Sequence, residues 1–212
     1  MFGIYITLLT ACFLCFLAYK KKLPKYLHFA GWLVGLVIIT ELFKYSMNGK
    51  KSIINPVEHF YQLIEIWLLL MCYYVYNKEN KNETIVKAIP FVLIAVSVLY
   101  PFISFYIEGI NNECTLSFLI NSLLLILLSL LFFYNLYVKN TEINILSFGF
   151  FWINAGNLVY LCGTFFQMGL YAYILKTNPA LAQELKIINH VLNYFLYATY
   201  LVAFLCTAKQ TS

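Results

Sequence analysis

The residues best suited to chemistry lie in one apolar stretch, Asn55 to Tyr76, which reads NPVEHFYQLIEIWLLLMCYYVY. A helix places Glu58, Gln62 and Glu65 on one face of this stretch, with His59 beside them. Carboxyl and imidazole groups bind protons, cations and polar ligands. Since an ionisable residue in a membrane helix is by default a candidate functional site, these residues are the first candidates for function.

Glu65 is the deepest of these residues. It lies about ten residues past Asn55, roughly 15 Å along a helix, which is close to the midplane of a bilayer. A carboxyl at that depth must be neutral or paired, and the stretch contains no lysine. We expect a protonated Glu65 hydrogen-bonded to Asn157 or Asn193. Such a pair serves either function or bundle stability, and both interpretations stay open.

The composition places the whole chain in a membrane. Of its 212 residues, 62% are hydrophobic and only 11% are charged, with a net charge of +5. The positive charge sits in short segments beside apolar runs, which indicates contact with anionic headgroups and leaves no basic face for nucleic acid. The bilayer is therefore the first partner to expect.

The apolar runs predict an all-α, polytopic protein with a single domain over residues 1–212. Seven membrane-spanning helices form one bundle, because the connecting segments are too short for a separate domain. The predicted spans are 2–19, 27–45, 57–76, 85–107, 115–138, 143–170 and 187–208.

Several local patterns predict helix boundaries and packing. Asn55, Pro56 and Glu58 predict a capping box at the start of the third span, and this alone would explain Glu58. Asn178 and Pro179 predict an N-cap and a first helical residue for the last helix. Pro101 predicts a kink.

Small residues predict close helix packing. Gly31 and Gly35 have the G-x-x-x-G spacing that admits a neighbouring backbone. Gly149, Gly156 and Gly163 repeat every seven residues along the sixth span. Cys12 and Cys15 lie within an apolar run, where small buried hydrophobes are the better interpretation of a C-x-x-C pair.

Lysine counting predicts the orientation, because lysines collect in cytoplasmic loops. With the N-terminus outside and the C-terminus in the cytoplasm, nine lysines lie inside and five outside. The inner set is Lys20, Lys21, Lys22, Lys25, Lys78, Lys81, Lys87, Lys139 and Lys209, and the outer set is Lys44, Lys50, Lys51, Lys176 and Lys186.

This orientation gathers the unusual polar residues toward the outside. We expect a polar pocket that opens outward between the second, third, sixth and seventh spans. Its predicted lining is Glu41, Glu58, His59, Gln62, Glu65, Asn154, Asn157, Gln167, Asn189, His190 and Asn193. Simpler interpretations remain open: Glu41 can pair with Lys44 at the interface, and the asparagines can serve only to join helices.

Three classes of function fit such a pocket. The first is a sensor or signalling module, in which a small ligand, lipid or proton engages the pocket and a membrane partner reads the helix rearrangement. The second is a metal-dependent intramembrane lipid hydrolase with Glu58, His59, His190 and Glu41 as ligands, although no fixed metal-ligand spacing supports it. The third is a small proton-coupled transporter with Glu65 as its proton site. We expect the sensor, with no cofactor and no bound metal.

Two known seven-helix classes are excluded by their required residues. A retinal protein needs a lysine in the middle of its last helix, and residues 187 to 208 contain none. A ceramidase-like hydrolase needs a set of three histidines with Asp and Ser, and this chain has no Asp at all.

Three segments carry a resemblance: HFYQLIEIWLLLMCYYVY, FWINAGNLVYLCGTFFQMGL and INHVLNYFLYATYLVAFL. Together they resemble an uncharacterised family of small seven-helix membrane proteins of Bacteroidota, often encoded near sensor histidine kinases. The resemblance covers the third, sixth and seventh spans and carries over no catalytic residues. It implies an inner-membrane location and a signalling partner such as a sensor histidine kinase.

Overall fold

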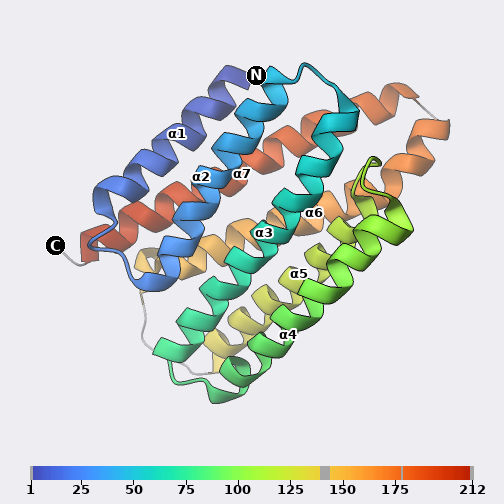
Figure 1. The fold of residues 1–212 in the computed structure, drawn as a ribbon. Helices are drawn as coiled ribbons and strands as arrows, with labels where there is room; N and C mark the ends of the chain where they lie inside the picture. Colours follow the sequence, from blue (N-terminus) through green and yellow to red (C-terminus); the bar gives the residue numbers. More distant parts are fainter. Residues whose placement is uncertain (1, 139–143, 178, 211–212) are drawn as a thin grey trace. The chain divides into compact units, whose positions relative to one another are not determined.

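The computed structural model describes residues 2–138, 144–177 and 179–210. Every regular element in these ranges is helical, so the predicted all-α class is confirmed (Figure 1). The elements are α1 (Phe2–Tyr19), α2 (Lys25–Ser46), α3 (Lys51–Glu79), α4 (Glu83–Phe102), the π-helix η1 (Ile103–Glu108), α5 (Thr115–Val138), the 3-10 helix η2 (Ile145–Ser147), α6 (Gly149–Thr177) and α7 (Pro179–Gln210).

Among the described residues, five helical segments are long and apolar enough to cross a membrane. They are Phe2–Tyr19, Lys25–Ser46, Glu83–Glu108, Thr115–Val138 and Ile187–Lys209. The membrane character predicted from composition is therefore confirmed. The helices α3 and α6 are each 29 residues long, and α3 is the helix that carries Glu58, His59, Gln62 and Glu65.

The predicted start of the third span at Asn55 and Pro56 is wrong. Helix α3 begins at Lys51 and contains Pro56 in its interior. The chain instead turns at Asn48 and Gly49, whose φ angles of 48° and 77° lie in the left-handed region that Asn and Gly tolerate best. Because the helix is already formed at Asn55, the predicted capping box of Asn55 and Glu58 does not exist.

The predicted start of the sixth span, residue 143, lies outside the described residues, and α6 begins at Gly149 after the short η2. Pro101 does mark a disturbance, because α4 passes into the π-helix η1 directly after it. A proline removes one helical donor, and a π-turn is one way the backbone adjusts to a lost hydrogen bond. Pro179 opens α7 as predicted, while the predicted cap Asn178 lies outside the described residues.

The chain divides into two compact units. Unit 1 comprises Met1–Cys15 and Leu119–Ser212, and unit 2 comprises Phe16–Phe118. In unit 2, α3 packs against α2 on one side and against α4 on the other (Figure 1). A methyl group on Gly31 would lie 2.3 Å from the ring of the buried Phe16. The surface of α2 at Gly31 therefore accommodates an aromatic ring, and the approach of a neighbouring backbone predicted from G-x-x-x-G stays a prediction.

Unit 1 is built on the close packing of α6 against α7. A Cβ atom on Gly156 would lie 2.0 Å from Thr199 Oγ1, and one on Gly163 would lie 2.6 Å from Leu192 Cδ1. Thr199 and Leu192 are themselves seven residues apart, so two glycines of α6 receive two side chains of α7. The close packing predicted from the glycine repeat is confirmed at these two positions.

Candidate functional site

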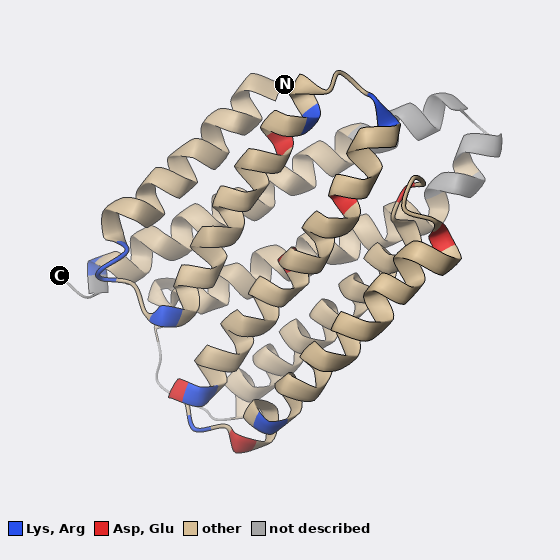
Figure 2. Cartoon of the chain, viewed as in Figure 1, with Lys and Arg blue, Asp and Glu red and all other residues tan. Residues whose placement is uncertain are grey.

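Polar side chains meet at the end of unit 2 where α2 finishes and α3 begins. Helices α3, α4, η1 and the first turn of α5 contribute, together with the segment of residues 109–114. We call these residues the His59 cluster: His59, Gln62, Tyr100, Ser104, Glu108, Cys114 and Ser117. Figure 2 shows Glu residues on the ribbons of this part of unit 2, whereas the opposite end is rich in lysine.

His59 lies at the centre of the cluster and is only 3% exposed. Its Nδ1 atom lies 3.0 Å from Ser104 Oγ, and its Nε2 atom lies 3.2 Å from the carbonyl oxygen of Asn112. The Tyr100 hydroxyl donates to the His59 carbonyl oxygen at 2.9 Å. One residue of α3 is thus tied to α4, to η1 and to the segment before α5.

A line of hydroxyl groups continues from His59 to Glu108. Ser104 Oγ lies 3.3 Å from Ser117 Oγ, and both serines are almost fully buried. The Ser117 hydroxyl donates to Glu108 Oε2. Glu108 also accepts the backbone N–H of Leu116 through Oε1. Since Leu116 and Ser117 belong to the first turn of α5, the Glu108 carboxylate satisfies donors that a helix start leaves unpaired.

Gln62 and Cys114 form the second branch of the cluster. Gln62 Nε2 donates to Cys114 Sγ at 3.0 Å, and Gln62 Oε1 lies 3.3 Å from the Tyr100 hydroxyl. Burial, and after it the negative charges of Glu58 and Glu108, raises the pKa of Cys114 to about 12. The thiol is therefore a neutral hydrogen-bond partner at physiological pH.

An ion triad lies beside the cluster. Lys44 Nζ lies 2.8 Å from Glu41 Oε1 and 3.2 Å from Glu58 Oε1. The predicted pairing of Glu41 with Lys44 is confirmed, and Glu58 has this ion pair in place of the predicted cap. The three side chains are about one quarter exposed. Lys44 also lines a surface hollow of about 480 Å³, together with Tyr45, Asn48 and Gly49. A small polar molecule in this hollow can therefore reach the Lys44 ammonium of the triad.

Glu65 lies two turns further along α3 from Glu58. Its side chain is hydrogen-bonded to Tyr61 of the same helix. The predicted hydrogen bond between Glu65 and an asparagine of the sixth or seventh span stays a prediction. Tyr61 was not expected as the partner, although its spacing of four residues places both side chains on one helix face.

The remaining predicted pocket residues lie in unit 1, where several of them pair within that unit. Asn157 Oδ1 accepts the hydroxyl of Tyr200 at 2.9 Å, and both residues are buried. Asn154 donates to the Phe150 carbonyl at 2.8 Å, and Asn193 donates to the Asn189 carbonyl at 2.9 Å. Gln167 is partly buried and His190 is exposed. The Asn157–Tyr200 bond joins α6 to α7 and agrees with the interpretation of the asparagines as residues that join helices, whereas these bonds of Asn154 and Asn193 lie within a single helix. The predicted single pocket stays a prediction.

Sequence reasoning missed most of the His59 cluster. The predicted pocket lining did not include Tyr100, Ser104, Glu108, Cys114 or Ser117. A usable signal was present, because Ser104 and Ser117 are polar residues in apolar helices flanking a segment with two glutamates. Within the described residues, no group of three or more His, Cys, Asp or Glu side chains is arranged to hold a metal ion.

The chemistry available to this site is that of its own residues. They are an imidazole, a carboxylate, hydroxyls, an amide and a thiol, all joined by hydrogen bonds. Such groups exchange protons and bind small polar molecules. In comparisons with known proteins, no family model, curated protein or solved structure matches the chain.

Proposed function

We propose that this protein is a multi-pass sensor of the inner membrane, with seven membrane-spanning helices, an outer N-terminus and a cytoplasmic C-terminus. The His59 cluster and the adjoining ion triad are its input site. A membrane partner such as a sensor histidine kinase reads its helix movements. The observation that carries the proposal is the burial of His59 among hydrogen bonds to three different elements, because a change at this residue alters the contacts of all three.

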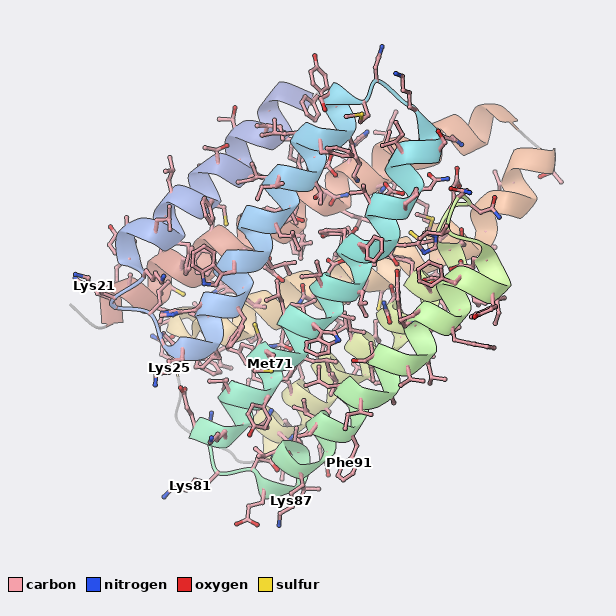
Figure 3. The ribbon with its side chains drawn as sticks, in the orientation of Figure 1. Lys21, Lys25, Met71, Lys81, Lys87 and Phe91 are labelled. Carbon is pink, nitrogen blue, oxygen red and sulfur yellow. The ribbon has the colours of Figure 1, made fainter. Side chains whose placement is uncertain are left out.

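The charge distribution of unit 2 supports the outward orientation of the input site. Seven lysines lie at the end formed by the start of α2, the end of α3 and the start of α4: Lys20, Lys21, Lys22, Lys25, Lys78, Lys81 and Lys87. Figure 3 shows Lys21, Lys25, Lys81 and Lys87 projecting from this end. The end with the His59 cluster has three lysines, Lys44, Lys50 and Lys51. Lysine-rich ends face the cytoplasm, so the cluster faces outward.

Short connections support a signal carried by helices. The segments that join α1 to α5 contain between three and six residues. A displacement of α3 against α4 at the input end therefore moves both helices at the lysine-rich end, where a partner in the membrane or cytoplasm can contact them. Helices that shift in this way are a common element of switching proteins.

Cysteine labelling tests the orientation. Asn48→Cys and Asn80→Cys place single thiols in exposed turns at the two ends of unit 2. A membrane-impermeant maleimide added to intact cells should label Asn48→Cys and should label Asn80→Cys only after permeabilisation. The parent chain, whose described cysteines are buried or partly buried, measures the background. The reverse pattern would place the input site in the cytoplasm.

A proton-coupled transporter is the second candidate, and Glu65 is the observation that favours it. Its carboxyl lies within α3, bonded to Tyr61, on the same helix as the input site. Purified protein in liposomes with an internal pH-sensitive dye distinguishes the two functions. A transporter moves protons when a gradient and a substrate mixture are applied, and loses this activity in Glu65→Gln. The sensor shows no flux above empty liposomes.

A further inference from the structure

The hydrogen atoms of the His59 cluster can be assigned from its acceptors. The Asn112 carbonyl oxygen can only accept, so His59 Nε2 carries a hydrogen in every protonation state. The carboxylate of Glu108 also only accepts when ionised, so the hydroxyl hydrogen of Ser117 points to it. The state of His59 Nδ1 then decides the direction of the remaining hydroxyl, that of Ser104.

With a neutral His59, one contact of the line has no hydrogen. Nδ1 is then an acceptor and takes the only hydroxyl hydrogen of Ser104. The Ser117 hydrogen is already given to Glu108. The two serine oxygens, 3.3 Å apart, face each other without a hydrogen between them.

With a protonated His59, every contact has its hydrogen. Nδ1 donates to Ser104, Ser104 donates to Ser117, and Ser117 donates to Glu108. The hydrogen bonds run in one direction from a cation to an anion, and bonds of this charge-assisted kind are the stronger ones. His59, Ser104 and Ser117 are 3%, 2% and 1% exposed. Water therefore cannot replace any of these hydrogen bonds.

From this arrangement we infer that the ligand of the input site is a proton, bound at His59 Nδ1 and balanced by Glu108 through Ser104 and Ser117. The inference rests on the proposed function for its biological meaning, and it names the ligand of that same site. Glu108 is the more exposed end of the line and provides the entry from solvent.

The proton can travel along the same line. When Glu108 takes up a proton it becomes a donor, and the Ser117 hydroxyl turns from Glu108 to Ser104. The new Glu108 O–H bond then breaks as an O–H bond forms on Ser117, Ser117 passes its original hydrogen to Ser104, and Ser104 passes its own to His59 Nδ1. One proton has then moved from solvent to the imidazole, which becomes a cation, while Glu108 returns to a carboxylate.

Charged and titratable groups surround this line on all the elements packed against it. Lys44 and Glu41 lie on α2, Glu58 and Glu65 on α3, Tyr100 on α4, and Cys114 beside the first turn of α5; Lys51 pairs with Glu113 at 2.7 Å. The triad carries two carboxylates against one ammonium, and the Lys51–Glu113 pair is balanced. These groups therefore carry no excess of positive charge that would repel a proton bound at His59.

Proton binding changes contacts that lead out of the site. Reversal of the Ser104 hydroxyl alters the pairing of η1 with α5. Glu108 is ionised in both states and accepts the Leu116 N–H in both, so it holds the first turn of α5 in place while the contact between Ser104 and Ser117 gains its hydrogen. Since π-helical segments such as η1 occur frequently at functional sites, η1 is the element that we expect to respond.

Nuclear magnetic resonance of the full chain, labelled with ¹⁵N-histidine and reconstituted in lipid nanodiscs, tests the inference. His28→Gln and His190→Gln variants assign the ring signals of His59. At a pH of about 6.5, where an ordinary imidazole is half protonated, the ratio of protonated to neutral His59 is measured. Glu108→Gln removes the charge and keeps the shape, and Ser104→Ala interrupts the line.

Both variants should lower this ratio about fivefold, since a hydrogen bond from a charged group is stronger than one from a neutral group. Matched controls are Glu113→Gln, which removes a charge at the same end outside the line, and Ser97→Ala, whose hydroxyl bonds only the Leu93 carbonyl. These should change the ratio less than twofold, about the scatter expected for substitutions outside the network.

Two results would overturn the inference. One is a Glu108→Gln effect equal to that of Glu113→Gln, which would show a general effect of charge. The other is a His59 ring that stays neutral in the parent chain under acid. Neither result contradicts the proposed function. The proposed function fails if a structural change at the input end is not transmitted to the lysine-rich end.

Discussion

Replacement of Tyr100 by Phe tests how firmly the His59 cluster joins α4 to α3. Tyr100 is 5% exposed, and its hydroxyl lies 2.9 Å from the His59 carbonyl and 3.3 Å from Gln62 Oε1. A hydroxyl has one hydrogen, so the substitution removes one net hydrogen bond and leaves no cavity. Such a bond contributes about 0.5 to 1.5 kcal/mol. We expect Tyr100→Phe to lose about 1 kcal/mol, which changes the unfolding equilibrium about fivefold.

The assay is equilibrium unfolding of detergent-solubilised protein, followed by intrinsic fluorescence in a titration with sodium dodecyl sulfate. Tyr106→Phe is the matched control, because Tyr106 is 81% exposed and lies in the next turn of the same segment. Its free energy of unfolding should change by less than about 0.5 kcal/mol. If Tyr100→Phe and Tyr106→Phe behave alike, the Tyr100 hydroxyl does not join the helices and the described cluster is incorrect.

Three further predictions follow from individual contacts. Gly156→Ala should destabilise the protein by about 1 to 3 kcal/mol because its new methyl group meets Thr199, whereas Gly169→Ala, with open space around it, should not; thermal unfolding of the two variants distinguishes them. The rate of Cys114 alkylation by iodoacetamide should still rise about tenfold per pH unit near pH 10, because the thiolate forms only as the pH approaches the raised pKa of about 12. A rate that levels off just above the ordinary pKa of 9.0 would contradict this prediction. Glu65→Gln should retain the parent stability because an amide oxygen still accepts the Tyr61 hydroxyl, whereas Glu65→Leu should lose about 1 to 3 kcal/mol; equal losses in both variants would show that Glu65 is charged and paired.

The helical class and the membrane character follow from the sequence because they depend on composition and on the length of apolar runs. The glycine repeat also predicted real packing, since a residue without a side chain leaves room for a neighbour wherever it lies on a helix. Helix starts were less predictable. Two turn signals stood six to seven residues apart, Asn48-Gly49 and Asn55-Pro56, and only the first ends a helix. A proline is tolerated within a membrane helix when neighbours satisfy the backbone, so Pro56 gave a misleading boundary.

The sequence predicted the site residues of α3 but not their partners on the other helices. His59, Gln62 and Glu58 were found because polar residues in an apolar helix stand out in the sequence. Their partners depend on which helices pack together, and spacing along a single helix carries no such information. Ser104 of η1 bonds His59 directly, and Ser117 of α5 is joined to His59 through Ser104. Both contacts depend on how η1 and the start of α5 pack against α3. Glu58 is a further example, because the sequence predicted a helix cap for it and gave no sign of its ion pair with Lys44 of α2.

Hydrogen–deuterium exchange of the full chain in lipid nanodiscs tests the sensor most directly. The parent chain and His59→Gln are compared at neutral and at acidic pH, and protection is measured at residues 103–117 and at the lysine-rich segment 77–87. With the proton as its ligand, the proposed sensor predicts that acid changes protection at both ends in the parent chain and at neither end in His59→Gln. A change confined to residues 103–117, with the 77–87 segment unaltered, would show that the input site does not communicate with the lysine-rich end and would contradict the sensor.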